Sequence, residues 1–242
     1  MSVSDVIFPS QPLDSAPLQL VLLDLDGTLI EPEHEFVFAE IELFFGGCGV
    51  TPPERSSLEH AARRGAVWEW LPAEGREELV AKFWSDYRRH LYPHPRVLDS
   101  AVAALNALRS TGLKTAVVTF RSQTSREVSA ILEPTGLLAH LDAVYSMGEL
   151  ASTAPDKSPI ITRALNDFGV QACNTCIVGD AAPDIRSGRA CNLRYAIAVE
   201  TGGMTYDYLA SLAPDYILSH ISELPALLHS ISKSNVVVES TG

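Results

Sequence analysis

Six short, almost continuously apolar runs constrain the fold of this chain more than any other feature. They are LQLVLLD (18–24), KTAVVTF (114–120), LDAVYSM (141–147), NTCIVGD (174–180), RYAIAVE (194–200) and PDYILS (214–219). Runs of this length and character are typical of strands that are buried on both faces. Helical periodicity falls between them, as in RVLDSAVAALNALRSTG (96–112), SREVSAILEP (125–134) and SPIITRALNDFG (158–169). This alternation predicts an α/β fold, with a Rossmann-like parallel sheet that carries helices on both faces.

One segment, residues 31–95, interrupts the alternation. It contains the helical patterns HEFVFAEIELFFGG (34–47) and GREELVAKFWSDYRRHLY (75–92), and it has no convincing strand. We therefore expect a small α-helical cap domain, inserted after the first strand and placed to cover its end. The α/β core then comprises residues 18–30 and 96–232, and residues 1–17 form a flexible tail.

Composition excludes several classes of function. The formal net charge is -12, and no cluster of Lys and Arg offsets it, so nucleic acid is not an expected partner. No signal peptide and no apolar stretch of membrane-spanning length is present, which predicts a cytoplasmic protein that does not bind membranes. Nothing in the sequence decides between a monomer and a homodimer.

The pair of cysteines in CNTC, Cys173 and Cys176, could be a redox or metal motif. No second pair of Cys or His residues stands at the spacing of a zinc site, and Cys176 begins an apolar run. Buried, reduced thiols are therefore the preferred interpretation.

Two aspartates follow the first apolar run. Asp24 and Asp26 are two residues apart, so both side chains can face the same edge of the sheet while Leu25 points into the core. Gly27 permits a sharp turn, and its amide and that of Thr28 could donate to an anion. A turn would explain Asp26 and Gly27. It does not explain a carboxylate at the end of a buried strand, because that group loses hydration unless a cation or a donor compensates.

Further polar residues follow later strands in order. They are Thr119, Arg121, Lys157, Asp180 and Asp184. Each has an ordinary structural interpretation: a strand hydroxyl, a solvated lysine at a helix start, an acid in a first helical turn. In a parallel sheet, however, ligands bind beyond the carboxyl ends of the strands, and all these residues are expected there.

These motifs, DLDGT, VVT, Lys157 and GDAAPD, resemble those of the haloacid dehalogenase superfamily. The helical insertion resembles the caps of its phosphoglycolate phosphatase-like and phosphoglucomutase-like members. The resemblance implies a Mg²⁺ site formed by the side chains of Asp24 and Asp180 and the carbonyl of Asp26. It also implies that Asp24 attacks phosphorus to give an aspartyl phosphate and that Asp26 acts as general acid and base.

The phosphoryl and substrate-binding residues implied by the resemblance are Gly27, Thr28, Thr119, Arg121 and Lys157, with Lys157 also catalytic. Asp184 is expected to orient Lys157 or a metal-bound water. Dehalogenases and phosphonate-cleaving relatives lack an acid at the position of Asp26, so the resemblance excludes both activities.

The expected function is a Mg²⁺-dependent phosphatase for a small phosphorylated metabolite of the phosphoglycolate or sugar-phosphate type. A phosphomutase, or a non-catalytic phosphate-binding scaffold, are the alternatives; a signalling receiver domain ranks last, because it has neither DxDGT nor a cap. The chain departs from the family at Phe120 and Arg121, where Asn is frequent, and at Ser158, which precedes Pro159. Many capped relatives carry an acid after the nucleophile motif, where this chain has IEPE, and the sequence does not decide whether Glu31 or Glu33 takes its place. These differences lie on the substrate side and leave the substrate open.

Cap residues should then read the leaving group. Arg63, Arg64 or His34 could meet an acidic or hydroxylated substrate, although a solvated helix face is the preferred interpretation of the arginines. The tryptophans of the insertion, Trp68, Trp70 and Trp84, are expected to pack rather than to stack on a base.

Overall fold

The computed structural model of the chain describes residues 16–87, 95–150 and 156–239. Its centre is a six-stranded sheet in which every pair of neighbours is parallel, in the order β3-β2-β1-β4-β5-β6. The strands are β1 (Leu20–Leu23), β2 (Lys114–Thr119), β3 (Ala143–Ser146), β4 (Thr175–Gly179), β5 (Tyr195–Val199) and β6 (Tyr216–Leu218). Each lies within one of the six apolar runs, so the expected α/β fold is confirmed.

The order of the strands fixes where a site can form. From β1 the chain passes to β2 and β3 on one side of the sheet and then crosses to β4, β5 and β6 on the other. Leu23 at the end of β1 is level with Val117 of β2 and with Val178 of β4. The crevice beyond these three strands lies at the switch in strand order, where α/β proteins bind ligands.

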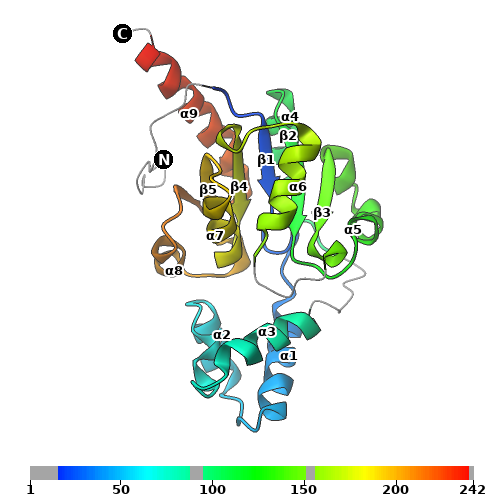
Figure 1. Ribbon diagram of the computed structural model, residues 1–242, viewed down its shortest axis with the longest axis vertical. Coiled ribbons are helices and arrows are strands. Elements are labelled where there is room, and N and C mark those ends of the chain that lie inside the picture. Colours follow the sequence, from blue (N-terminus) through cyan, green and yellow to red (C-terminus); the bar gives the residue numbers. More distant parts are fainter. Residues whose placement is uncertain (1–15, 88–94, 151–155, 240–242) are drawn as a thin grey trace.

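Helices cover both faces of the sheet (Figure 1). On the face of Val21 and Leu23 lie α4 (Ala101–Ser110), α5 (Ser125–Leu132) and α9 (Leu224–Glu239). On the face of Leu20 and Leu22 lie α6 (Ser158–Phe168), α7 (Ala182–Ala190) and α8 (Tyr206–Ser211). Successive side chains of β1 point to opposite faces, and helices cover both faces, so every residue of the strand is buried. This is why the strand sequence shows no polar alternation.

The segment between β1 and α4 folds into α1 (His34–Gly47), α2 (Arg55–Ala62) and α3 (Arg76–Tyr87), which we call the helical insertion. It has a separate apolar core that includes Phe38, Phe45 and Phe83. Trp68 and Trp84 pack against the Phe83 ring, with centroids 4.8 and 5.2 Å away, as expected for packing residues. Trp70, by contrast, is 38% exposed.

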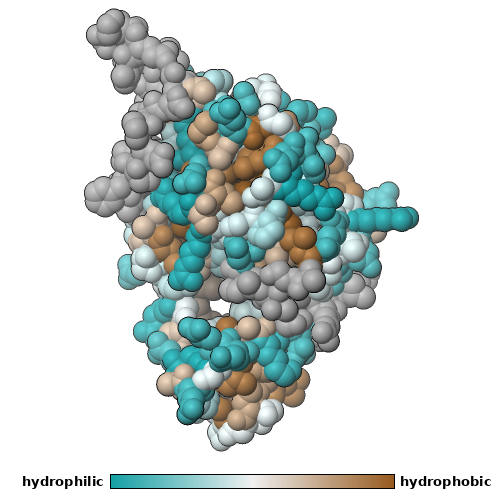
Figure 2. Space-filling model, viewed as in Figure 1, coloured by the Kyte–Doolittle hydropathy of each residue, from teal (hydrophilic) through white to brown (hydrophobic). Residues whose placement is uncertain are grey.

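The helical insertion lies beyond the carboxyl ends of the strands (Figure 1), and a waist separates it from the lobe that contains the sheet (Figure 2). Two chain segments run side by side at this waist. The amide of Glu31 donates to the carbonyl of Arg96 at 2.8 Å, and the amide of Leu98 donates to the carbonyl of Leu29 at 3.0 Å. Glu31 also pairs with Arg96 through its side chain, at 3.2 Å, so it is engaged at this connection.

Three further expectations concern the N-terminal tail, the cysteines and membrane-spanning helices. The flexible tail expected at residues 1–17 lies outside the described residues except for its last two positions. Cys176 is buried in β4 and Cys173 is partly exposed, each as a free thiol. In the part of the chain that the structure describes, no helix combines the length and the apolarity needed to cross a membrane.

Candidate active site

Lys157 lies at the centre of the crevice. It is 1% exposed, and its Nζ donates to Oδ1 of Asp24 at 2.5 Å, to Oδ1 of Asp184 at 2.6 Å and to the carbonyl of Val118 at 3.0 Å. Its own amide donates to Oγ of Ser187 at 2.8 Å, which fixes the start of α6 against α7. Burial alone would lower the pKa of Lys157, but Asp184 and Asp24 outweigh burial and raise it above its ordinary value. The lysine is therefore a fixed positive charge.

Three carboxylates surround this charge. One oxygen from each of Asp24, Asp180 and Asp184 lies within 4.8 Å of the others, and all three residues are buried. Burial, followed by the negative charges of Asp24 and Asp184, raises the pKa of Asp180 well above its ordinary value. Burial likewise raises the pKa of Asp184 to about 7, although Lys157 acts against the rise. Three acids compensated by one lysine form an environment that favours a further cation.

The turn after β1 brings the first of these acids into place. Gly27 has φ of +83°, a conformation that side chains disfavour, and its amide donates to the carbonyl of Ile30 at 2.8 Å. The amide of Thr28 donates to the carbonyl of Leu25 at 3.3 Å. Both amides are thus engaged inside the turn, so the anion-binding role expected for them would require these bonds to open. The hydroxyl of Thr28 faces Oδ1 of Asp180, at 3.5 Å.

Asp26 has a different partner from Asp24. Arg121 donates from Nε to Oδ2 of Asp26 at 2.9 Å and from Nη2 to Oδ1 at 2.7 Å, a two-pronged ion pair. The side chain of Arg121 is 5% exposed and that of Asp26 is 38% exposed. The amide of Arg121 donates to Oγ1 of Thr119, itself 1% exposed, at 3.3 Å. The structure therefore places Arg121, expected among the phosphate-binding residues, on the carboxylate of Asp26.

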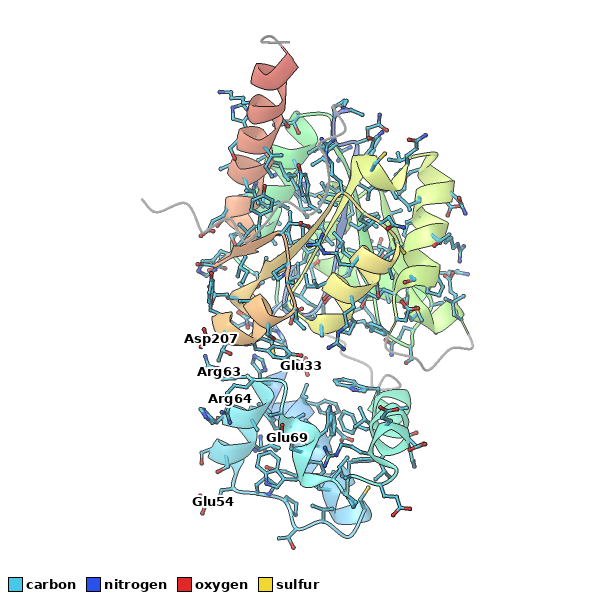
Figure 3. All side chains as sticks on the ribbon, turned by 60° about the vertical axis from the view of Figure 1, so that its left-hand side comes forward. Glu33, Glu54, Arg63, Arg64, Glu69 and Asp207 are labelled. Carbon is cyan, nitrogen blue, oxygen red and sulfur yellow. The ribbon has the colours of Figure 1, made fainter. Side chains whose placement is uncertain are left out.

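The helical insertion contacts the core again on the side of α8. Nε of Arg63 donates to the carbonyl of Gly203 at 3.1 Å, and the amide of Thr205 donates to the carbonyl of Arg63 at 2.8 Å. Figure 3 shows this junction from the side, with Arg63 on the insertion and Asp207 on α8 across from it. His34, at the start of α1, lies over Gly203, and its pKa is lowered by burial and by the charge of Arg63.

Comparison with known proteins identifies the family to which this fold and site belong. The family model described as haloacid dehalogenase-like hydrolase matches residues 21–198. The chain belongs to the haloacid dehalogenase-like hydrolases. It is 29% identical to a plasmid-encoded phosphoglycolate phosphatase of Cupriavidus necator, over 88% of this chain and 94% of that one. It is 26% identical to the pyrophosphatase PpaX of Halalkalibacterium halodurans, over 86% and 95% of the two chains.

Solved structures agree with this assignment. A predicted phosphatase from Clostridium acetobutylicum superposes with a TM-score of 0.65 at 21% identity, covering 89% of this chain and all of the other. At that identity the likeness establishes the shared fold only. The match to the family model confirms the resemblance expected from DLDGT, VVT, Lys157 and GDAAPD as membership of the haloacid dehalogenase-like hydrolases.

Sequence reasoning did not find every residue that supports this hydrolase site. The hydroxyl of Thr201, in the turn after β5, donates to the carbonyl of Gly27, and Gly202 lies against the carboxylate of Asp180. The adjacent pair Gly202 and Gly203 was the one available signal, since paired glycines after a strand mark a close approach of backbone to another group. The roles expected for the site residues remain predictions that the geometry makes specific.

Proposed function

We propose that this hydrolase is a phosphatase that cleaves a small phosphorylated metabolite through an aspartyl phosphate on Asp24. The observation that carries the proposal is the contact between buried Asp24 and buried Lys157 at the switch point of the sheet, 2.5 Å apart. A buried carboxylate held by a fixed cation is an oriented nucleophile for phosphorus, and the same cation compensates the charge of a phosphoryl group. Asp26, two residues on, supplies the second acid that the chemistry needs.

The reaction follows from the placement of these groups. Lys157 and the hydroxyl of Thr119 hold phosphoryl oxygens while Oδ of Asp24 bonds to phosphorus and the phosphorus–oxygen bond of the ester breaks. Asp26 gives its proton to the leaving oxygen. It then takes a proton from the water that attacks the aspartyl phosphate, which releases inorganic phosphate and restores Asp24.

The donor set fits Mg²⁺. Asp24 and Asp180 offer buried carboxylate oxygens, and the carbonyl of Asp26 is expected to add a third ligand. Burial, followed by the charges of Asp24 and Asp184, raises the pKa of Asp180, and a bound cation would favour its ionised form. Held by these oxygens, Mg²⁺ would supply positive charge that offsets the negative charge of a phosphoryl group. Asp184 accepts a hydrogen bond from Lys157 at 2.6 Å, and we assign it the role of orienting that lysine.

The substrate is proposed at the level of class. Two similar chains are named for phosphoglycolate and for pyrophosphate, so similarity alone does not select one substrate. We assign the helical insertion the role of a cap that excludes water and contacts the leaving group, because it lies beyond the strand ends and joins the core at the waist and at Gly203. A cytoplasmic location is likewise part of the proposal and rests on the sequence.

The test is release of inorganic phosphate from a panel of phosphorylated metabolites, with Mg²⁺ or with EDTA. We expect release that requires Mg²⁺ and falls by about 10³-fold or more in Asp24→Asn, because the nucleophile is removed. Asp99→Asn is the control, since Asp99 is an exposed aspartate outside the crevice. Conversion of a sugar phosphate to its isomer without net release would identify a mutase instead. Neither product from any compound would leave a non-catalytic phosphate binder.

A further inference from the structure

The ion pair between Arg121 and Asp26 has a consequence for the substrate. We propose that Arg121 selects phosphate esters whose leaving group carries a carboxylate, by exchanging its ion pair with Asp26 for one with the substrate. This inference rests on the proposed phosphatase function and adds to it the chemical class of the leaving group and the residue that reads it.

The pair has to open before Asp26 can transfer a proton. Both oxygens of Asp26 accept hydrogen bonds from the guanidinium, at 2.9 and 2.7 Å. A carboxylate in this arrangement must give up at least one of the two bonds before it can reach the leaving oxygen of an ester. The structure therefore records a resting arrangement of the general acid.

Arg121 is the more deeply buried partner of the ion pair. Its side chain is 5% exposed, and breaking the pair takes from Nε and Nη2 the two acceptors that Asp26 provides, which carries a desolvation cost. Asp26, at 38% exposed, can return to water when it leaves the pair. The exchange is thus favourable only when a second anion arrives to take the place of Asp26 on Arg121.

The backbone around Arg121 keeps its position fixed during such an exchange. Its amide donates to Oγ1 of Thr119 at 3.3 Å, and its carbonyl accepts from Oγ of Ser146 at 2.8 Å. Thr119 is the residue proposed to hold a phosphoryl oxygen. The backbone of Arg121 is thus tied to Thr119 and its guanidinium to Asp26, two residues after the proposed nucleophile. An anion that replaces Asp26 is therefore expected near the phosphoryl group, as the carboxylate of a short phosphorylated hydroxy acid would be.

The fork of Arg121 also matches a carboxylate in geometry. A guanidinium binds a carboxylate through two parallel hydrogen bonds, which is the arrangement it already makes with Asp26. A substrate carboxylate reproduces both bonds and frees Asp26 in one event. A neutral leaving group does not, so the pair stays closed and the proton transfer is slow.

The experiment compares two esters of equal length, 2-phosphoglycolate and 2-hydroxyethyl phosphate, by phosphate release with Mg²⁺. For the wild-type protein we expect kcat/KM to favour the acidic ester by about 10-fold or more, the factor that a hydrogen bond to a charged group supplies. In Arg121→Gln this ratio should fall to about 3-fold or less, because the acidic ester loses both hydrogen bonds to the guanidinium. Arg121→Lys keeps the charge but loses the fork, so its ratio should lie between the two.

Arg126→Gln is the matched control, because Arg126 is an exposed arginine in the next helix, and its ratio should equal that of the wild type. An equal rate on both esters, or a ratio unaltered by Arg121→Gln, would overturn the inference and leave the phosphatase in place. Should thermal melting show that Arg121→Gln does not fold, a wild-type ratio in Arg121→Lys would overturn it. Absence of phosphate release from both esters and from the wider panel would overturn the inference and the proposed function together.

Discussion

Lys157 shows how much a single residue contributes to the charge balance of this site. It lies among Asp24, Asp180 and Asp184, and its Nζ is bonded to two of them. Three buried carboxylates without a cation would repel one another at low effective dielectric. The lysine is therefore needed for stability before any substrate binds, as well as for holding phosphate.

We expect Lys157→Met to lower the free energy of unfolding by about 3–5 kcal/mol in EDTA, since it removes one partner from a buried ion pair. Denaturant unfolding followed by circular dichroism measures this change. Lys114→Met is the matched control: Lys114 pairs with Asp142 at 3.0 Å, but its side chain is 57% exposed, so its loss should cost about 1 kcal/mol or less. Equal losses in the two variants would show that the buried lysine has no special structural role.

At the scale of elements, the strands were predictable because a parallel strand must be apolar on both faces. The runs around β1 and β4 show no alternation in sequence, and every residue of both strands is buried. The site motifs were predictable for a related reason, since the carboxyl ends of neighbouring parallel strands meet at one edge. α2 was not predicted: it has eight residues, of which Leu58 and Ala61 alone are buried, too few to show a period.

Pairings between distant charged groups were not predictable. Asp26 and Arg121 are 95 positions apart, and both were expected to face the substrate, yet they face each other. Periodicity reports which residues are buried and not which partner a buried charge takes. For the same reason, the sequence offered Arg63 as a substrate contact or as part of a solvated helix face but did not identify its partner. Arg63 is exposed, and its Nε donates to the carbonyl of Gly203.

The contact of the helical insertion with α8 provides a test at this scale. A Cβ on Gly65 would lie 2.3 Å from Cε2 of Tyr208, so Gly65→Ala should displace the end of α2 from α8. Gly75→Ala is the control, because its φ of +71° is close to the +69° of Gly65 while its nearest neighbour, an oxygen of Glu78, is 3.8 Å away. Both variants should lose about 1–2 kcal/mol of stability from backbone strain.

Gly65→Ala alone should also lower kcat/KM for phosphate release by about 10-fold or more, since small displacements of a cap misplace the reacting groups. Adding Tyr208→Ala removes the ring that the new methyl group meets and should restore most of the activity. An effect of the same size in Gly75→Ala, or no recovery in the double variant, would show that this junction does not position the helical insertion.

The molecule has two lobes, each with its own apolar core, and the helical insertion lies beyond the carboxyl ends of the strands (Figure 1). The acids of the crevice follow β1 and β4 at those ends. The stability of the whole chain is therefore linked to the protonation of acids in that crevice. The pKa of Asp184 is raised to about 7 from an ordinary 3.8, chiefly by burial, and that of Asp180 is raised in the same direction. Between these values the folded protein holds a proton that the unfolded chain has released.

Unfolding in this range releases protons, so raising the pH favours the unfolded state. The stability contributed by protonated Asp184 is full below about pH 4 and is lost as the pH rises through about 7. Acids with lowered pKa values, such as Asp142 and Asp156, act in the opposite sense, but their effect is complete above about pH 5.5. His34 also has a lowered pKa, so it acts in the same sense as Asp142 and Asp156, and both the wild type and Asp184→Asn contain it.

We expect the metal-free wild type to lose stability relative to Asp184→Asn between pH 5.5 and pH 8, by on the order of 2 kcal/mol. The measurement is denaturant unfolding of both proteins in EDTA at the two pH values. The contribution of His34 cancels when the change in stability of one protein between the two pH values is subtracted from that of the other. In the wild type, Mg²⁺ should then raise the melting temperature more at pH 8 than at pH 5.5, because a cation binds ionised carboxylates and competes with protons. A wild type whose stability follows that of Asp184→Asn across the range would show that the crevice acids do not carry the linkage. A shift by Mg²⁺ that is the same at both pH values would show that the cation binds without displacing a proton.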